Sequence, residues 1–257
     1  MITLITGASS GIGEALAHEF ARRRSDLVLV ARSGDKLRTL ADALTRAHGV
    51  KAHVVVADLA APGSAARVVD HVRAIGRVDV LVNNAGFATF GPFVDTDLPT
   101  EIDEIRLNVE TLTELTKRLL PDVLAARGKI LNVASTAAFQ PGPLMAVYYA
   151  TKAYVLSFSE ALGEELRGSG VTVTCLCPGP TRTGFQSRAG QEGARLLEIG
   201  LMDAEAVAGA AVRGLFRGRR VIVPGVLNRL GVWVVRFSPR GAVLRVIKWL
   251  HGRVRGA

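Results

Sequence analysis

Residues 2–13 read ITLITGASSGIG, an apolar run followed by a glycine-rich turn that opens a helical pattern. Glycine permits a tight turn and lets a phosphate approach the backbone N–H groups at a helix N-terminus, where the helix dipole favours negative charge. A tight turn without a ligand is the alternative, but the strand-to-helix context is the one a dinucleotide site requires. We therefore predict that the turn holds a dinucleotide pyrophosphate, through Gly7, Ser9, Ser10, Gly11, Ile12 and Gly13.

Along the rest of the chain, apolar runs rich in Val, Ile and Leu alternate with longer helical patterns. Such runs are typical of strands buried on both faces of a parallel sheet. The alternation predicts an α/β fold in which a doubly wound, seven-stranded parallel sheet has helices on both faces. The expected strands are 2–6, 27–31, 53–57, 79–83, 129–134, 171–177 and 220–224, and the expected helices 11–24, 34–48, 63–76, 99–126, 147–168 and 203–217.

The composition favours one large domain. The chain has 257 residues, of which 49% are hydrophobic and 21% charged, so it can bury a sizeable core. No repeat or low-complexity linker interrupts it, and we expect a catalytic domain over 1–225 with an extension over 226–257. The apolar start lacks the basic region of a secretory signal, so we expect a cytoplasmic protein.

Cysteine and histidine give no sign of a metal site. Cys175 and Cys177 are the two cysteines, and adjacent positions on one face of a strand rarely meet disulfide geometry, so we expect both to be buried and reduced. The five histidines are scattered and form no ligand motif. We predict no catalytic metal.

The residue after the second predicted strand indicates the type of dinucleotide. A protein that selects NAD usually places an acidic residue there for the ribose hydroxyls, whereas this chain has Arg32. Arginine can clamp a 2′-phosphate, and no carboxylate is present to repel it. Arg32 could also be an ordinary solvated charge. We predict that NADP(H) is favoured over NAD(H), with use of NAD(H) left open.

Polar and small residues follow the third and fourth predicted strands. Asp58 and Leu59 come after the third strand, where Asp58 could accept a hydrogen bond from an adenine amino group. Asn83, Ala85 and Gly86 come at the fourth, where small residues let the chain pass beside a cofactor. Asp and Asn also cap loops and helices without any ligand, so only their order along the chain makes them informative.

Tyr148 and Lys152 lie four residues apart in a predicted helix, with Ser135 at the end of the preceding strand. Residues at this spacing share a helix face, so a phenol and an ammonium can act on the same substrate atom. A phenol normally has a pKa near ~10, and a neighbouring cation lowers it. Tyr149 is three residues from Lys152 and could also reach it, but the serine separation and the four-residue spacing select Tyr148.

Taken together, these motifs resemble those of the short-chain dehydrogenase/reductase family. The resemblance runs from Thr3 to about Phe185, and it includes the glycine-rich turn and the Tyr-x-x-x-Lys pair in the family's order. It implies a single-domain Rossmann fold and a reversible hydride transfer between a nicotinamide cofactor and a carbonyl or alcohol.

The resemblance also assigns roles to particular residues. Tyr148 would be the general acid, Lys152 would lower its pKa and bind the nicotinamide ribose, Ser135 would hold the substrate oxygen, and Asn108 would anchor a water that relays protons. A solvated helix asparagine is the plain alternative for Asn108. The segment after the sixth strand, with Pro178, Gly179 and Thr181, would touch the nicotinamide carboxamide, and 184–202 would form a lid over the substrate.

The carboxyl end departs from the simplest family pattern. Residues 213–257 carry 11 Lys or Arg and no carboxylate, so the basic character of the chain belongs to its tail. Residues 227–237 and 242–251 read as two amphipathic helices with tryptophans and valines beside arginines. The segment 226–254 could contact an anionic membrane surface peripherally, cover the substrate pocket or pack on a partner subunit, and we expect no nucleic-acid binding.

Two functions fit these features. The first is an NADPH-dependent reductase of a lipophilic ketone, aldehyde or 3-oxoacyl compound, which the intact Ser135, Tyr148 and Lys152 favour. The second is a non-catalytic dinucleotide-binding regulator that acts through its basic tail. Long helices over 99–126 and 147–168, whose family counterparts often pair between subunits, predict a homodimer or homotetramer.

Overall fold

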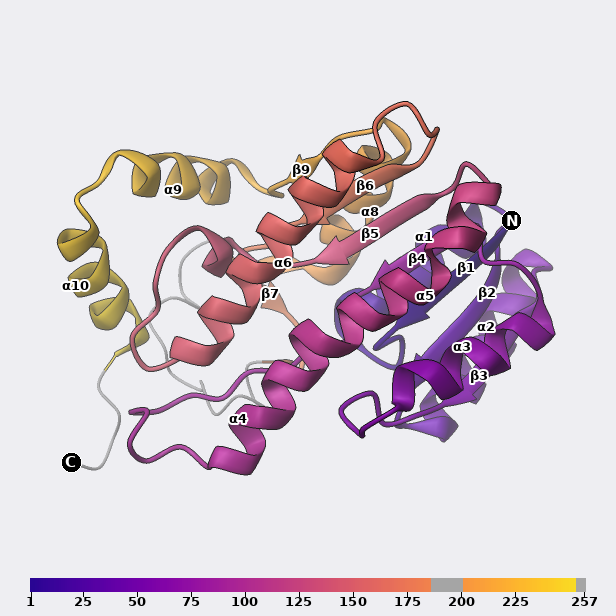
Figure 1. Ribbon diagram of the computed structural model, residues 1–257, viewed down its shortest axis with the longest axis horizontal. Helices are drawn as coiled ribbons and strands as arrows, with labels where there is room; N and C mark the ends of the chain where they lie inside the picture. Colours follow the sequence, from indigo (N-terminus) through magenta and orange to yellow (C-terminus); the bar gives the residue numbers. More distant parts are fainter. Residues whose placement is uncertain (186–200, 253–257) are drawn as a thin grey trace.

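A seven-stranded parallel sheet forms the centre of the molecule in the computed structural model, which describes residues 1–185 and 201–252 (Figure 1). The strand order is β3-β2-β1-β4-β5-β6-β9, and every neighbouring pair is parallel. The predicted doubly wound fold is confirmed. The strands are β1 Ile2–Thr6, β2 Asp26–Ala31, β3 Ala52–Val56, β4 Val80–Asn83, β5 Lys129–Val133, β6 Thr172–Leu176 and β9 Val221–Ile222, the last shorter than expected.

Helices cover both faces of this sheet. Leu4 and Ile5 are neighbours in β1 and point to opposite faces, because side chains alternate along a strand. Ile5 belongs to the core cluster formed with α1 (Gly11–Arg22), α2 (Gly34–His48) and α8 (Ala204–Phe216). Leu4 belongs to the cluster formed with α3 (Ser64–Ile75), α5 (Leu112–Ala125) and α6 (Ala146–Glu165). Both strand faces are therefore buried, which explains the absence of polar alternation in the strand sequences.

The order of the strands places a crevice at the centre of the sheet. β1 lies between β2 and β4, so the chain leaves β1 towards one edge and leaves β4 towards the other. In open parallel sheets, ligands bind beyond the carboxyl ends of the strands at such a switch point. The glycine-rich turn after β1 and the Asn-Asn-Ala-Gly segment after β4 meet there.

The helix predicted over 99–126 is interrupted. It is built of α4 (Leu98–Ile105), a π-helical segment over Arg106–Thr111 and α5. Within the π-helical segment, Asn108 bonds the backbone of Phe87 and Thr111 donates to the carbonyl of Leu59. These long-range contacts hold two loops against the helix, and wide turns of this kind often occur at functional sites.

The remaining elements lie around the carboxyl edge of the sheet. A 3₁₀ turn covers Thr136–Phe139, and the short strands β7 (Thr181–Arg182) and β8 (Met202–Asp203) pair in parallel. The last two helices, α9 (Val226–Phe237) and α10 (Arg240–His251), lie at the left of Figure 1, beyond the sheet and beside the start of α6. Within the described ranges, no helix has the length and apolar character that crossing a bilayer requires.

Candidate active site

The glycine-rich turn is packed against the loop that follows β4. Gly7 has a φ of +66°, which side chains rarely tolerate, and a Cβ on Gly13 would lie 2.2 Å from the carbonyl oxygen of Gly7. Asn84 donates from Nδ2 to the carbonyl of Thr6 at 2.9 Å, and the hydroxyl of Thr6 accepts from the backbone N–H of Ala85 at 3.0 Å. These contacts hold the N-terminus of α1 open towards the crevice.

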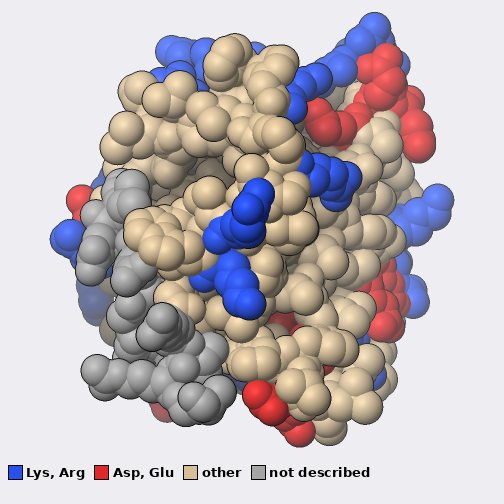
Figure 2. All heavy atoms as spheres, turned by 90° about the vertical axis from the view of Figure 1, so that its left-hand side faces the viewer, with Lys and Arg blue, Asp and Glu red and all other residues tan. Residues whose placement is uncertain are grey.

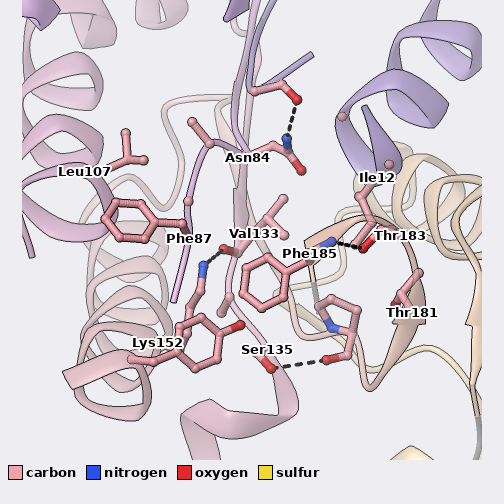
Figure 3. A pocket seen from close by; sticks show the side chains of 18 of the residues that line it. Ile12, Asn84, Phe87, Leu107, Val133, Ser135, Lys152, Thr181, Thr183 and Phe185 are labelled. Carbon is pink, nitrogen blue, oxygen red and sulfur yellow. Dashed lines mark hydrogen bonds between the residues drawn. The ribbon is translucent and has the colours of Figure 1, made fainter. Parts of the chain in front are cut away.

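A cavity of about 320 Å³ extends along the carboxyl ends of the sheet strands (Figure 3). It brings together nearly all of the residues predicted from the sequence, although they come from six different strand ends and from α6. The predicted residues that line it are Gly7, Ser9, Ser10, Gly11, Ile12, Gly13, Arg32, Asp58, Leu59, Ala85, Gly86, Ser135, Tyr148, Lys152, Pro178, Gly179 and Thr181.

Two predicted residues do not line this cavity. Asn83 is buried under it and donates from Nδ2 to Thr116 and to Asn132, while the next residue, Asn84, takes the position on the cavity wall. Asn108 is 1% exposed, and its side chain exchanges two hydrogen bonds with the backbone of Phe87 and donates to Thr151. The side chain of Asn108 therefore acts on the loop after β4 rather than on the cavity.

One end of the cavity is lined by exposed polar residues after β2 and β3. Arg32 and Ser33 follow β2, and no carboxylate in the described part of the chain pairs with Arg32. Asp58 follows β3, and its Oδ1 accepts from the backbone N–H of Ala60 at 3.0 Å. The guanidinium of Arg32 is thus available to an anionic group at this end.

At the other end of the cavity, the three predicted catalytic side chains Ser135, Tyr148 and Lys152 come together. Figure 3 shows Ser135, after β5, and Lys152, on α6, directed into the same space. The ammonium of Lys152 lies 5.6 Å from the centroid of the Tyr148 ring and donates to the carbonyl of Val133 at 2.9 Å. The hydroxyl of Ser135 accepts from the backbone N–H of Ala137 at 3.1 Å, so the serine is fixed at the start of the 3₁₀ turn.

Burial determines the protonation of these groups. It raises the pKa of the Tyr148 phenol above its usual value of 10.0, and the hydrogen bond with Ser135 opposes the shift. Burial also lowers the pKa of Lys152 to about 8. That Lys152 lowers the pKa of Tyr148 stays a prediction; in this structure the loss of hydration has the larger effect, and the pKa of the phenol lies above its usual value. The phenol keeps its proton at neutral pH.

Tyr149 has a different partner. Its hydroxyl lies 2.9 Å from Nε2 of His251, which comes from α10 and is 102 positions away in the chain. The His251 ring also packs on the Tyr149 ring at a centroid distance of 5.6 Å, and burial lowers the pKa of His251 to about 4. The hydroxyl of Tyr149 is therefore engaged with the C-terminal helix.

The sequence analysis missed a buried carboxyl group, Glu104. It lies on α4, is fully buried, and accepts from the backbone N–H and hydroxyl of Thr89 through Oε2 at 2.8 and 2.9 Å. Its Oε1 has no hydrogen-bond partner among the described residues. Burial raises the pKa of Glu104 to about 7, Thr89 and Lys152 oppose the shift, and Glu101 adds to it. Its place four residues before Asn108 was a weak signal, since that spacing shares a helix face.

The segment after β6 closes one side of the cavity. Thr181 is 5% exposed and donates to the carbonyl of Gly179 at 2.9 Å. Phe185 packs against Tyr148 with ring centroids 5.6 Å apart. A lid was predicted over 184–202, and residues 186–200 of it lie outside the described residues.

The C-terminal helix α10 completes the wall on the Tyr148 side. Val243 and Ile247 are 8% and 7% exposed and belong to one apolar cluster with Met145, Tyr148 and Tyr149. Ile247 and His251 also line the cavity. Packing over the pocket was one of the alternatives that the sequence left open for 226–254, and no local pattern could select it, because α6 and α10 lie far apart in the chain.

Comparison with known proteins agrees with this architecture. The family model described as short chain dehydrogenase matches residues 1–193. A very-long-chain 3-oxoacyl-CoA reductase from Anas platyrhynchos is 38% identical over 184 residues, which cover 68% of this chain and 58% of that protein. The chain thus spans less than two thirds of the length of this relative.

Solved structures extend the similarity to almost the whole chain. A short-chain dehydrogenase from Sphingobium yanoikuyae in complex with NADPH is 36% identical, with a TM-score of 0.82 over 100% of this chain and 98% of that one. A short chain dehydrogenase/reductase from Burkholderia phymatum in complex with NAD is 26% identical, with a TM-score of 0.81 over 90% and 91%. The chain belongs to the short-chain dehydrogenase/reductase family and has the Rossmann fold of its dinucleotide-bound relatives.

Proposed function

We propose that this protein is an NADPH-dependent oxidoreductase that transfers a hydride between the nicotinamide and a carbonyl or alcohol carbon of a lipophilic substrate. The observation that carries the proposal is the convergence of Ser135, Tyr148 and Lys152 on one cavity that begins at the glycine-rich turn. A ketone, an aldehyde or a 3-oxoacyl compound would fit this chemistry.

The residues along the cavity suit a dinucleotide whose adenine lies near β3 and whose nicotinamide lies near α6. The N-terminus of α1 would hold the pyrophosphate, Asp58 and Leu59 the adenine, and Lys152 and Thr181 the nicotinamide end. When bound, the nicotinamide supplies or accepts the hydride. The close approach of Gly13 to the carbonyl of Gly7 supports this placement, because it lets the first turn of α1 pack tightly against the turn after β1.

Tyr148 would donate a proton to the substrate oxygen during reduction. Its position supports this role, because the phenol lines the cavity with Ser135 and Lys152 and holds a proton at neutral pH that the developing alkoxide, a much stronger base, can accept. Ser135 would hold the same oxygen by a hydrogen bond, and the Lys152 ammonium would stabilise the phenolate that remains. A positioned acid of this kind typically contributes ~10²–10⁴-fold to the rate.

Arg32 supports a preference for NADP(H). It lines the cavity directly after β2, where a carboxylate would select a free ribose, and among the described residues no carboxylate pairs with the guanidinium that could hold a 2′-phosphate. Use of NAD(H) stays open, since solved relatives are described in complex with either dinucleotide.

The substrate end of the cavity supports a lipophilic ligand. Phe87, Met145, Phe185 and Ile247 line the cavity, and the last three pack in one apolar cluster with Tyr148. A relative named as a very-long-chain 3-oxoacyl-CoA reductase fits an acyl substrate of this kind. No observation favours the alternative of a non-catalytic regulator.

We also propose a homodimer or homotetramer with a cytoplasmic location. Tyr154 on α6 is 37% exposed, stacks on Phe158 and bonds the hydroxyl of Thr113 on α5, so the two helices present a joint outer face. Light scattering of the purified protein tests the assembly, and cell fractionation tests the location.

Turnover of a panel of carbonyl compounds, followed by NADPH absorbance, tests the proposed activity. Tyr148→Phe should abolish turnover and leave NADPH binding intact, because it removes the donated proton and little volume. Tyr149→Phe is the matched control and should retain most activity. The opposite outcome would transfer the acid role to Tyr149, and no turnover with any carbonyl compound would remove the proposal.

A further inference from the structure

The helix α9 turns its apolar face away from the protein. Val226, Leu230, Trp233 and Phe237 follow one another at spacings of four, three and four residues, so they share one helix face. They are 71%, 56%, 62% and 69% exposed, and no residue of α9 is buried. A surface helix normally packs its apolar stripe on the core, so the reverse orientation needs an external partner.

Basic residues border this stripe, and carboxylates are lacking. Arg229 and Arg236 are exposed on α9, and Arg240, Arg245 and Lys248 are exposed on α10. No Asp or Glu occurs after Glu205. Figure 2 looks onto this end of the molecule, where lysine and arginine side chains stand among uncharged ones and most of the visible carboxylates gather toward the edge.

The second helix continues the surface to the reactive cavity. On α10, Val246 and Trp249 are 54% and 59% exposed, while Ile247 and His251 of the same helix line the cavity. One face of α10 thus belongs to the solvent-exposed apolar surface and the other to the cavity wall.

We infer that α9 and α10 form a docking surface for an anionic lipid bilayer, into which the outer stripe of α9 and Trp249 insert. Aromatic and aliphatic side chains next to arginines are the composition that binds the boundary between headgroups and acyl chains, where acyl chains bury the apolar side chains and anionic headgroups pair with the bases. The inference extends the proposed function, because docking would place the cavity wall formed by α10 at the source of a lipophilic substrate.

A second copy of this chain is a poorer occupant of the same surface. A twofold interface sets the same patch against itself, so Arg229 and Arg236 would lie in an interface to which the other copy adds the same basic residues. Neither tail would supply a carboxylate to pair with them, since residues 213–257 contain none. An anionic bilayer neutralises the same charges.

The two tryptophans of the chain report directly on docking. Trp233 and Trp249 are the only ones present, and both are mostly exposed. With vesicles of phosphatidylcholine containing phosphatidylserine, tryptophan emission of the full chain should shift to shorter wavelength, and the protein should sediment with the vesicles. Pure phosphatidylcholine and high salt should weaken binding, because the attraction to anionic headgroups is lost or screened.

Matched variants separate specific docking from general attraction. The double change Arg229→Glu with Arg236→Glu should weaken binding to anionic vesicles by about thirtyfold or more. Lys36→Glu with Arg46→Glu, an equal charge change on exposed sites of α2, should leave it nearly unchanged. Trp233→Ser with Phe237→Ser should abolish sedimentation with the vesicles. Circular dichroism checks that each variant is folded.

Three results would overturn the inference. The first is no binding to anionic vesicles, and the second is equal loss in the α2 control. The third is undiminished vesicle binding by the Trp233→Ser, Phe237→Ser variant, which would show that the apolar stripe of α9 does not insert. The vesicle assay needs no turnover, so a failed carbonyl panel would affect the proposed function and leave this inference standing.

Discussion

At the scale of single residues, Glu104 and Lys152 influence each other's protonation beside the reactive cavity. The negative charge of Glu104 raises the pKa of Lys152, and the positive charge of Lys152 lowers that of Glu104. Burial acts in the opposite direction on both groups, so their pKa values lie close together, at about 8 and about 7. We therefore expect activity near neutral pH to depend on Glu104, a residue outside the Tyr-x-x-x-Lys motif.

Glu104→Gln should move the alkaline limb of the kcat/KM profile to lower pH. The substitution removes the charge that favours the ammonium, so the pKa of Lys152 falls further below about 8 and the charged form is lost sooner as pH rises. Glu110→Gln, an exposed change on the same helical stretch, is the control. If the limb stays in place in Glu104→Gln, Glu104 does not act on Lys152.

Arg32→Ala should raise the KM for NADPH by about tenfold to a hundredfold and leave the KM for NADH nearly unchanged. A hydrogen bond to a charged group contributes about 1.5–3 kcal/mol, and only NADPH carries the 2′-phosphate. Steady-state kinetics with both dinucleotides measure the effect, with Arg46→Ala on α2 as control. Equal changes for the two cofactors would show that Arg32 does not read the 2′-phosphate.

The sequence indicated most residues on the cavity wall but not their electrostatics. Tyr148 and Lys152 share a face because of helical spacing alone, which any reader of the sequence can count. The direction of the Tyr148 pKa shift depends instead on how much water the fold removes around the ring, and spacing carries no such information.

At the scale of elements, α10 is attached to α6 by a contact that depends on pH. His251 is 3% exposed and lies 2.9 Å from the Tyr149 hydroxyl, with Phe90 packed beside it. Its pKa of about 4 lies below the usual 6.5, so the docked helix holds the neutral imidazole. The stabilisation is complete above pH 6.5 and is lost as pH falls through that value towards 4.

Hydrogen exchange of the α10 amides should therefore accelerate as pH is lowered from 7 to 5, after correction for the intrinsic exchange rate. The linkage corresponds to about 2 kcal/mol at pH 5. His251→Gln can still accept from Tyr149 but does not titrate, so its α10 exchange should lose this dependence, whereas exposed His71→Gln should retain it. A pH dependence that persists in His251→Gln would show that another group is responsible.

Element boundaries were predictable where the pattern is local. The helix expected over 34–48 coincides with α2, which ends at Gly49 in the left-handed conformation. The π-helical segment at 106–111 was not predictable, because Asn108 and Thr111 distort the helix through contacts with residues 21 and 52 positions away. The two tail helices were expected, and only the fold shows which face of each is turned outward.

At the scale of the whole molecule, ligand binding and global stability are coupled. The cavity is lined from six strand ends, so it exists only when the sheet is folded. A ligand that binds only the folded protein adds about 2.7 kcal/mol to the free energy of unfolding at a hundred times its Kd. NADPH at that concentration should raise the melting temperature by about 5–10 °C. Differential scanning fluorimetry with and without NADPH measures the shift.

Gly13→Ala should abolish this shift, because its Cβ would lie 2.2 Å from the carbonyl oxygen of Gly7 and displace the turn. Tyr148→Phe should keep it, since the phenol acts on the substrate oxygen. Gly231→Ala on α9, where an added Cβ meets nothing within 4 Å, controls for the loss of a glycine. A full shift in Gly13→Ala would place the dinucleotide away from this turn.

The sequence by itself determined the parallel sheet, the glycine-rich turn, the order of the strand-end residues and the Tyr148–Lys152 pair. Each of these follows from the period of a strand or helix or from the geometry of one turn, which neighbouring residues encode. The tertiary structure alone decided that Glu104 is buried near Lys152 and that Asn84, rather than Asn83, lies on the cavity wall. It also decided the Tyr149–His251 contact and the outward apolar face of α9. These depend on which distant segments meet and how much water they exclude, and no local pattern records either.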